Sequence, residues 1–362
     1  MDTFAFIIHP IDPKRDVSRK YPLLGKLLSE RQINFFSTFF PPVYISEIEG
    51  ITSEATGKQI KGWFVACPYT PQRMLELPEK TVYRKIIETG KMAEGLGAQI
   101  LGLGAFTSVI GDAGLTIANA LDVPVTTGDS YTVSLAVEAI KQAAVIMDIP
   151  ISCATVAVVG ATGAIGKVCA ELLADEAGEL YLIGRRAEAL ETLRERWQPK
   201  AKAQLRTSTS MDVLQNAQLI LTVTSAVHDI IRPENLMPGA VVCDVARPRD
   251  VSAMVAAARD DILVIDGGMV DVPGPVDFHF NFGFPPGKSY ACMAETMALA
   301  LEGRFEDYTL GKEISRARVE EISQIAARHG FRLSGFRSFE RAVTPEQIEA
   351  VRRNAKKARR QL

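Results

Sequence analysis

Three glycines in the stretch GATGAIG, Gly160, Gly163 and Gly166, are spaced as GxxGxxG and could bind a dinucleotide. Glycines at this spacing allow a tight turn and a close approach of the backbone to a pyrophosphate, whose charge the amides of a following helix receive. The apolar run ATVAVV precedes them and the amphipathic stretch KVCAELLADE follows. A strand, a glycine turn and a helix in this order predict a dinucleotide site. The residues that we assign to it are Gly160, Ala161, Thr162, Gly163, Ala164, Ile165 and Gly166.

The end of the next predicted strand, 180–183, distinguishes NAD from NADP. NAD-binding folds usually place Asp or Glu there to bind the ribose hydroxyls, whereas this chain has Arg185 and Arg186 and no acid. An arginine can pair with a 2′-phosphate through two charge-assisted hydrogen bonds, so the sequence favours NADPH. The alternative is that both arginines only begin a solvated helix. Thr224 and Ser225 end a later predicted strand and are expected at the same edge of the sheet.

Cys292 has surroundings that could make its thiol a nucleophile. It follows the turn 285–287 and precedes a run of strong helix formers, so we expect it in the first turn of a helix. The helix dipole and free amides favour a thiolate there, and Lys288 could add to this effect. We therefore expect a lowered thiol pKa, the alternative being a small buried core residue. The other cysteines are spread singly, without the spacing of a disulfide framework or a metal site: Cys67, Cys153, Cys169 and Cys243.

The elements that must position these residues predict an α/β protein with a central doubly wound Rossmann domain. From Ala154 onward, apolar strand candidates alternate with helical stretches, which implies parallel strands joined by helical crossovers. A helix over 131–147 leads into this region. We expect an N-terminal α/β substrate domain over 1–132, an NADP-binding Rossmann domain over 133–272, and a C-terminal helical segment over 273–362 that carries Cys292.

The composition restricts the class of protein. With 362 residues, 47% of them hydrophobic, the chain can bury a sizeable core. The 41 Lys and Arg residues nearly balance the 43 Asp and Glu residues, so there is no overall electrostatic footprint for nucleic acid. No apolar run is long enough to span a bilayer, and the N-terminus does not resemble a secretory signal. A cytoplasmic protein is expected.

Six segments resemble, in the same order, the cyanobacterial-type long-chain acyl-[acyl-carrier-protein] reductases. They are DVSRK (16–20), TSEATGK (52–58), LGLGAFTSVIGD (101–112), TTGDSYT (126–132), ATVAVVGATGAIG (154–166) and YACMAETM (290–297). The resemblance implies NADPH-dependent reduction of a long-chain acyl thioester on acyl carrier protein to a fatty aldehyde, with Cys292 carrying the acyl group as a thioester. Exchange between two thioesters is nearly thermoneutral, so this route divides one difficult step into two.

The oxyanion of such a reaction needs hydrogen-bond donors. Helix-start amides near Cys292 are one source, and His279 could donate a proton, although a single histidine among aromatic residues is more often a packed or surface residue. The segment 272–288, which contains His279, has no clear counterpart in the family, so the preferred acyl chain length stays open. Four hydroxyls in glycine-flanked motifs, whose alternative role is ordinary turn formation, are further candidates: Thr107, Ser108, Thr126 and Thr127.

The C-terminal stretch RRNAKKARR, 352–360, could bind an acidic partner. It could steer an acyl carrier protein, contact an anionic membrane, or form only a solvated chain end. An aldehyde-consuming enzyme is a further partner suggested by the product. The basic residues are Arg352, Arg353, Lys356, Lys357, Arg359 and Arg360.

Two other functions stay open from the sequence. One is a dehydrogenase related to shikimate dehydrogenase or glutamyl-tRNA reductase, with a small acid as substrate; it would need cationic substrate clamps in the N-terminal domain and no role for Cys292. The other is a non-catalytic NADP-binding sensor, which would bind NADPH tightly without turning over a thioester.

Overall fold

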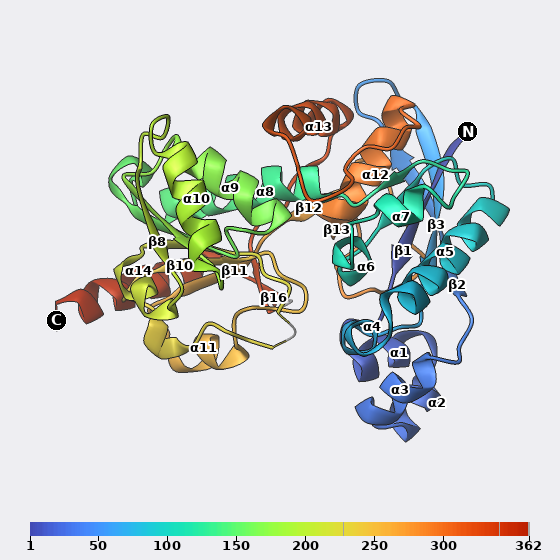
Figure 1. Cartoon of the computed structure of the whole chain (residues 1–362), viewed down its shortest axis with the longest axis horizontal. Coiled ribbons are helices and arrows are strands. Elements are labelled where there is room, and N and C mark those ends of the chain that lie inside the picture. Colours follow the sequence, from blue (N-terminus) through green and yellow to red (C-terminus); the bar gives the residue numbers. More distant parts are fainter. Residues whose placement is uncertain (227, 340, 361–362) are drawn as a thin grey trace. The chain divides into compact units, whose positions relative to one another are not determined.

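The computed structural model describes residues 1–226, 228–339 and 341–360, which form two compact units (Figure 1). Unit 1 comprises Met1–Tyr131 and Val270–Arg332, and unit 2 comprises Thr132–Met269 and Leu333–Leu362. The segment expected to be a separate C-terminal part is therefore divided between the units. The reason is packing: its first helix contacts the sheet of unit 1, whereas its last helix is bonded to residues of unit 2.

Unit 1 is built on a five-stranded sheet with the order β2-β3-β1-β4-β5. β2 is antiparallel to β3, and the other neighbouring strands are parallel. This sheet and its flanking helices are the α/β layer expected for the N-terminal part of the chain. The bounds are β1 (Asp2–Ile8), β2 (Val43–Thr52), β3 (Gln59–Ala66), β4 (Leu101–Leu103) and β5 (Val125–Thr126).

Helices α5 (Glu79–Gly95) and α12 (Ala291–Glu302) cover opposite faces of this sheet. Successive residues of a strand point to opposite faces. On β4, the side chain of Leu101 lies beside Gly90 of α5, whereas a Cβ built on Gly102 would meet Thr296 of α12. The sheet is thus buried between the two helices, and α12 is held against β1 and β4.

Unit 2 contains a six-stranded, all-parallel sheet with the order β11-β10-β9-β6-β7-β8. Counted from β6, this is the strand order 3-2-1-4-5-6 of a dinucleotide-binding fold, which confirms the predicted doubly wound domain. The bounds are β6 (Thr155–Val159), β7 (Glu179–Ile183), β8 (Gln204–Ser208), β9 (Leu219–Thr222), β10 (Val241–Asp244) and β11 (Leu263–Asp266).

The strand β6 is apolar because both faces of the sheet are covered. Val156, Val158 and Val159 are almost fully buried. The helix predicted over 131–147 is α8 (Asp129–Ile146), which connects the two units along the chain. The small strands are β12 (Met269–Asp271), β13 (Lys288–Tyr290), β14 (Arg332–Leu333), β15 (Arg337–Ser338) and β16 (Arg341–Ala342).

The remaining helices flank the sheets or connect their strands. In the described residues, no helix combines the length and the apolar character needed to cross a membrane. The bounds are α1 (Pro13–Lys20), α2 (Pro22–Leu27), α3 (Glu30–Ser37), α4 (Pro71–Glu76), α6 (Phe106–Val109), α7 (Leu115–Ala118), α9 (Ala164–Ala174), α10 (Ala187–Trp197), α11 (Ala253–Ala258), α13 (Arg316–His329) and α14 (Pro345–Arg359).

Candidate active site

Three loops of unit 1 follow parallel strands and therefore lie at the same edge of the sheet. His9 follows β1, residues 104–106 follow β4, and residues 127–129 follow β5. The backbone N–H of Phe106 donates a hydrogen bond of 2.9 Å to His9 Nε2, which joins the first two loops. Ligands of open α/β sheets bind outside the carboxyl ends of the strands. We therefore place the candidate active site at this edge.

Cys292 reaches this edge as the second residue of α12 and is partly exposed. The loop after β5 packs directly against it: a Cβ built on Gly128 would lie 2.3 Å from the Cα of Cys292. Gly128 also has a φ of +77°, in the left-handed region that favours glycine. The glycine of the TTGDSYT motif thus allows this loop to touch the start of α12.

Two backbone N–H groups lie close enough to the Cys292 sulfur to lower the pKa of its thiol. One belongs to Met293, in the first turn of α12, and the other to Ala105, in the loop after β4. Ala105 has a φ of 47° and a ψ of −121°, a conformation that costs an L-residue about 1–3 kcal/mol. Such strain is retained only where the surrounding structure holds it, and His9 does so by binding the next amide, that of Phe106.

Burial and, after it, the charge of the nearby Asp129 carboxyl raise the pKa of the Cys292 thiol to about 12, against the effect of the two amides. The lowered pKa expected from the helix start is therefore wrong. Lys288, which was expected to help, forms an ion pair with Asp271 instead. The thiol is neutral at physiological pH and must lose its proton in order to attack.

Two buried acids that sequence reasoning did not select lie beside Cys292. Asp129 is 5% exposed, and its pKa is raised to about 7 by burial and by the charge of Glu295, against the effect of the Thr127 hydroxyl. Glu295, one turn after Cys292 in α12, is fully buried. Both lie inside motifs that the sequence already singled out, but only their burial marks them as unusual.

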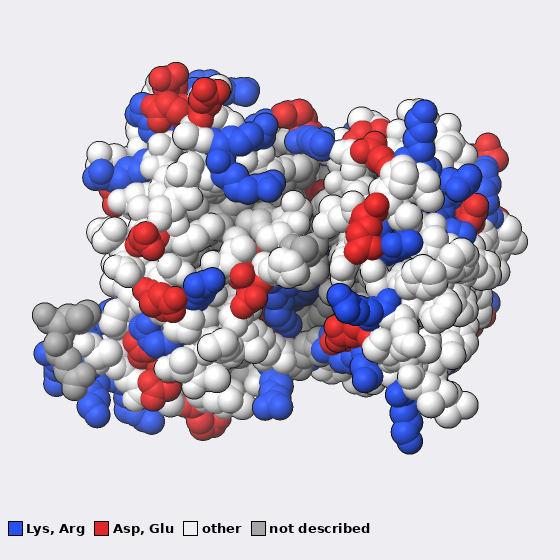
Figure 2. All heavy atoms as spheres, turned by 60° about the horizontal axis from the view of Figure 1, so that its bottom comes forward, with Lys and Arg blue, Asp and Glu red and all other residues white. Residues whose placement is uncertain are grey.

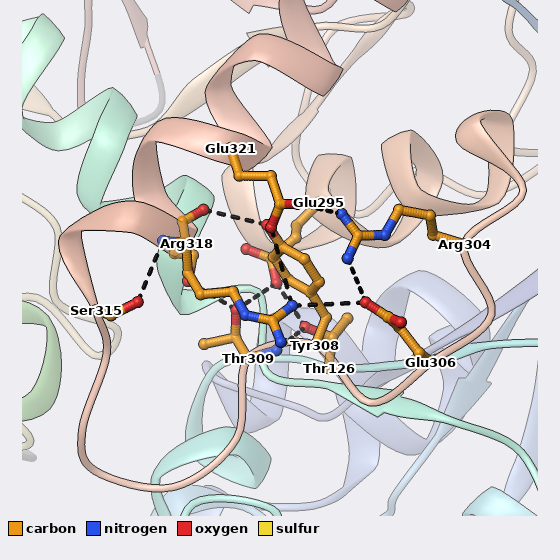
Figure 3. Close-up of polar contacts among 10 residues, drawn as sticks. Thr126, Glu295, Arg304, Glu306, Tyr308, Thr309, Ser315, Arg318 and Glu321 are labelled. Carbon is orange, nitrogen blue, oxygen red and sulfur yellow. Dashed lines mark hydrogen bonds and ion pairs between the residues drawn. The ribbon is translucent and has the colours of Figure 1, made fainter.

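Glu295 is held by three hydrogen bonds, which tie α12 to the end of β5, to the first turn of α8 and to the segment that follows α12 (Figure 3). Thr126 Oγ1 donates to its Oε1 at 2.5 Å, Thr309 Oγ1 donates to the same oxygen at 2.8 Å, and the Tyr131 backbone N–H donates to Oε2 at 2.8 Å. Burial raises the pKa of Glu295, and these hydrogen bonds oppose the shift. The carboxyl thus positions the nucleophile's helix.

A second layer of polar contacts lies behind Glu295 (Figure 3). The Tyr308 hydroxyl donates to Glu321 Oε2 at 2.8 Å, and Arg304 donates to the other oxygen of Glu321 at 2.6 Å. The Arg318 guanidinium lies 4.5 Å from the centre of the Tyr308 ring. These contacts connect α13 to the chain that follows α12 and support the helix that carries Cys292.

The four hydroxyls predicted as oxyanion donors differ in what they bind. Thr107 donates to the Gly104 carbonyl and Ser108 to the Ala105 carbonyl, which is ordinary turn formation, and Thr126 binds Glu295. The Thr127 hydroxyl is buried and, among the described residues, has no hydrogen-bond partner of normal geometry. Of these four predicted groups, Thr127 is the one whose hydroxyl is not already used.

His279 lies on the surface and not in the described site. Its side chain is 48% exposed and faces Glu49 at 3.6 Å and Asp277 at 3.4 Å. No contact with Cys292 is present in the part of the chain that the structure describes. Its location explains why a lone histidine among aromatic residues is a weak signal: its aromatic neighbours pack beside it while the imidazole points to solvent.

The glycine turn of unit 2 forms a cradle at the end of β6. Gly160 has a φ of +89°, and a Cβ there would lie 2.4 Å from the Val223 carbonyl oxygen at the end of β9. A Cβ on Gly166 would lie 2.2 Å from the Gly160 carbonyl oxygen. Gly163 begins α9 without a side-chain cap, so the first amides of the helix stay available to an anion. These residues fit a dinucleotide pyrophosphate.

Arg185 and Arg186 are exposed at the end of β7, and within the described residues neither forms an ion pair. A Cβ on the preceding Gly184 would lie 3.5 Å from Thr162 Oγ1, so the arginines adjoin the glycine turn. The two residues predicted at the end of β9 have different surroundings from each other. Thr224 donates its hydroxyl to Asp250 at 2.5 Å and is used inside the protein, whereas Ser225 is exposed.

Helix α14 is attached to unit 2 on one side and basic on the other. Arg352 forms an ion pair with Asp148, and Arg359 donates to the Pro238 carbonyl at 3.1 Å. Figure 2 shows basic side chains gathered near the end of this helix. The four other cations are exposed and form no ion pair among the described residues. They follow an i, i+3, i+4, i+7 spacing and line one surface hollow. We call these four residues the basic stripe: Arg353, Lys356, Lys357 and Arg360.

Comparison with known proteins gives relatives of the whole chain and of its dinucleotide fold. Residues 139–266 match a family described as shikimate / quinate 5-dehydrogenase. The chain is 31% identical to Aminotransferase PigE of a Serratia species, covering 97% of this chain but 42% of that protein. It is 30% identical to the long-chain acyl-[acyl-carrier-protein] reductase of Synechococcus elongatus, covering 91% of this chain and 98% of that protein.

The solved structures that resemble the chain are more distant. L-tryptophan dehydrogenase from Nostoc punctiforme superposes with a TM-score of 0.42 and 14% sequence identity, covering 100% of this chain and 89% of that one. The match of residues 139–266 to a dehydrogenase family agrees with the strand order seen in unit 2.

Proposed function

The chain belongs to the family of the long-chain acyl-[acyl-carrier-protein] reductases, and we propose that it reduces an acyl thioester on acyl carrier protein to a fatty aldehyde with NADPH. We propose further that Cys292 carries the acyl group between the two half-reactions. The observation that carries this assignment is the position of the Cys292 sulfur at the start of α12, beside the backbone N–H groups of Ala105 and Met293.

The residues around Cys292 suit acyl transfer. As the sulfur attacks a thioester carbonyl, negative charge develops on the carbonyl oxygen close to the sulfur. In this proposal the backbone amides of Ala105 and Met293, which lie beside the sulfur, stabilise such charge. The Thr127 hydroxyl, buried without a partner of normal geometry among the described residues, is a third donor at the same edge.

Unit 2 supplies the cofactor site in this proposal. The glycine turn and the first amides of α9 would hold the pyrophosphate, and Arg185 and Arg186 would hold the 2′-phosphate. When bound, NADPH supplies the hydride that reduces the thioester carbonyl. A cytoplasmic location is expected, because the mechanism needs Cys292 as a reduced thiol and the cytosol keeps thiols reduced.

We assign the basic stripe of α14 to the acidic carrier protein. Its four cations have no ion-pair partner in the described parts of the chain, so they present an unneutralised positive surface. Such a surface accelerates the approach of an oppositely charged protein without requiring a contact at the reacting atoms. Membrane attachment is the competing outcome, and addition of anionic vesicles would distinguish it.

The test is intact-protein mass spectrometry after incubation with a long-chain acyl carrier protein and no NADPH. Wild type should gain the mass of one acyl group, and NADPH should then discharge it as aldehyde. Cys292→Ala should gain nothing. Cys153→Ala is the matched control, because Cys153 is an exposed free cysteine whose loss should leave the adduct unchanged. Absence of both adduct and aldehyde in wild type would refute the proposal and favour a small-acid dehydrogenase or a sensor.

A further inference from the structure

The thiol of Cys292 needs a group that accepts its proton, and this inference rests on the acyl-cysteine route proposed above. We propose that Asp129 takes the Cys292 proton during attack and returns it to the departing carrier thiol. The carboxyl belongs to the first residue of α8, and the residue before it, Gly128, is in direct contact with the Cys292 backbone. Asp129 is therefore held next to the nucleophile by the loop after β5.

The surroundings of the sulfur explain why a base is required. Two acids, Asp129 and Glu295, are the charged side chains that act most strongly on the Cys292 thiol in the described residues, and both raise its pKa. A cysteine beside a cation or a protonated histidine rests as a thiolate, which needs no base. Here the resting form is the thiol, so its proton must leave as the carbon–sulfur bond forms.

Glu295 and His9, which lie at the same edge, already accept hydrogen bonds. Glu295 accepts three hydrogen bonds, from Thr126, Thr309 and the Tyr131 backbone. His9 uses Nε2 to accept the N–H of the loop after β4, and burial lowers its pKa to about 4, so it stays neutral with no free lone pair.

The carboxyl of Asp129 has no comparable partner. Among the described residues, the Thr127 hydroxyl approaches it without normal hydrogen-bond geometry. Burial and the Glu295 charge raise the pKa of Asp129 to about 7, which makes both protonation states accessible at neutral pH, as an acid–base group requires.

The step balances without an external reagent. The Cys292 sulfur forms a bond to the thioester carbon, the carbonyl electron pair moves to oxygen, and the thiol proton moves to the Asp129 carboxylate. The tetrahedral adduct then collapses: the bond between carbon and the carrier sulfur breaks, and the proton passes from Asp129 to that sulfur. The products are the acyl-enzyme and the free carrier thiol, with Asp129 again ionised and nothing oxidised or reduced.

Two measurements on Asp129→Asn test the assignment, because one rate should fall and the other should rise. The first is the single-turnover rate of acyl-enzyme formation between pH 6 and 9, which should fall by about 100-fold or more, with loss of the limb that reports a group near pH 7. The second is alkylation of Cys292 by iodoacetamide, which needs only the thiolate. It should become faster at a given pH, because removing the negative charge beside the sulfur lowers the thiol pKa.

The controls separate proton transfer from structure. Asp122→Asn changes the same chemical group at a 95% exposed side chain of unit 1 and should alter neither rate. Asp129→Glu should recover part of the acylation rate, since a carboxyl is restored. Slower acylation together with slower alkylation would overturn the inference, since that pattern marks a displaced Cys292.

If wild type is acylated normally and Asp129→Asn is acylated at the same rate, the role of Asp129 is refuted and the proposed function stands. Wild type that forms no acyl-enzyme would instead refute the proposed function, and this inference with it.

Discussion

Replacing Gly128 by alanine should displace the nucleophile, because this glycine is where the loop after β5 touches α12. The new Cβ would lie 2.3 Å from the Cys292 Cα and 2.7 Å from its carbonyl oxygen. These are backbone atoms at the start of a helix, so no side-chain rotation relieves the contact. Ordinary contact begins near 3.4 Å, so the two segments must separate by about 1 Å.

The energetic cost has two parts. Gly128 has a φ of +77°, where a Cβ costs about 1–2 kcal/mol. Overpacking against α12 adds about 1–3 kcal/mol. Gly57→Ala is the matched control, because Gly57 has a φ of +69° but nothing within 4 Å of a built Cβ, so it carries only the first part. The difference between the two variants isolates the contact with Cys292.

Thermal unfolding and acyl-enzyme formation together measure this effect. Gly57→Ala should lower the melting temperature slightly and leave acylation intact. Gly128→Ala should lower the melting temperature by about 2–4 °C more for each additional kcal/mol of destabilisation, for a unit of this size. Its acylation rate should fall by about 100-fold, the usual effect of a 1 Å misplacement of a reacting group. Equal melting temperatures and equal acylation rates in the two variants would refute the packing described for Gly128.

Three further changes test other parts of the molecule. Arg185→Ala/Arg186→Ala should raise the KM for NADPH by about 10–100-fold and that for NADH by far less, because charged hydrogen bonds to a phosphate are lost; equal effects would contradict the NADP assignment. Lys356→Ala/Lys357→Ala should slow the reaction with acyl carrier protein at low salt and match wild type at high salt; a salt-independent defect would argue against steering. The pKa of Asp129 is raised from 3.8 to about 7, so the native state binds more protons than the unfolded state between these values. The free energy of unfolding of wild type should therefore fall as pH rises toward 7, and denaturant titrations of Asp129→Asn should show a flatter decline.

The sequence predicted the features that depend on neighbouring residues. The buried run 155–159, the glycine turn after it and the following helix are contiguous, so their order alone indicates a dinucleotide-binding fold. Arg185 and Arg186 were placed at a strand end in the same way. The prediction that Cys292 lies in the first turn of a helix is also correct. It depends on local signals, namely the proline and glycine turn before this residue and the helix formers after it.

Only the tertiary structure decided what surrounds Cys292. The direction of the thiol pKa depends on burial and on two acids, one of them distant in the chain, and these outweigh the effect of the helix start. The strained amide of Ala105 and the imidazole of His9 come from other strands and meet at the sheet edge through strand order. The C-terminal segment likewise divides between two units according to what each helix packs against. Spacing along a chain reports local conformation, whereas desolvation and charge depend on residues brought together by packing, so the chemical state of the site follows from the fold.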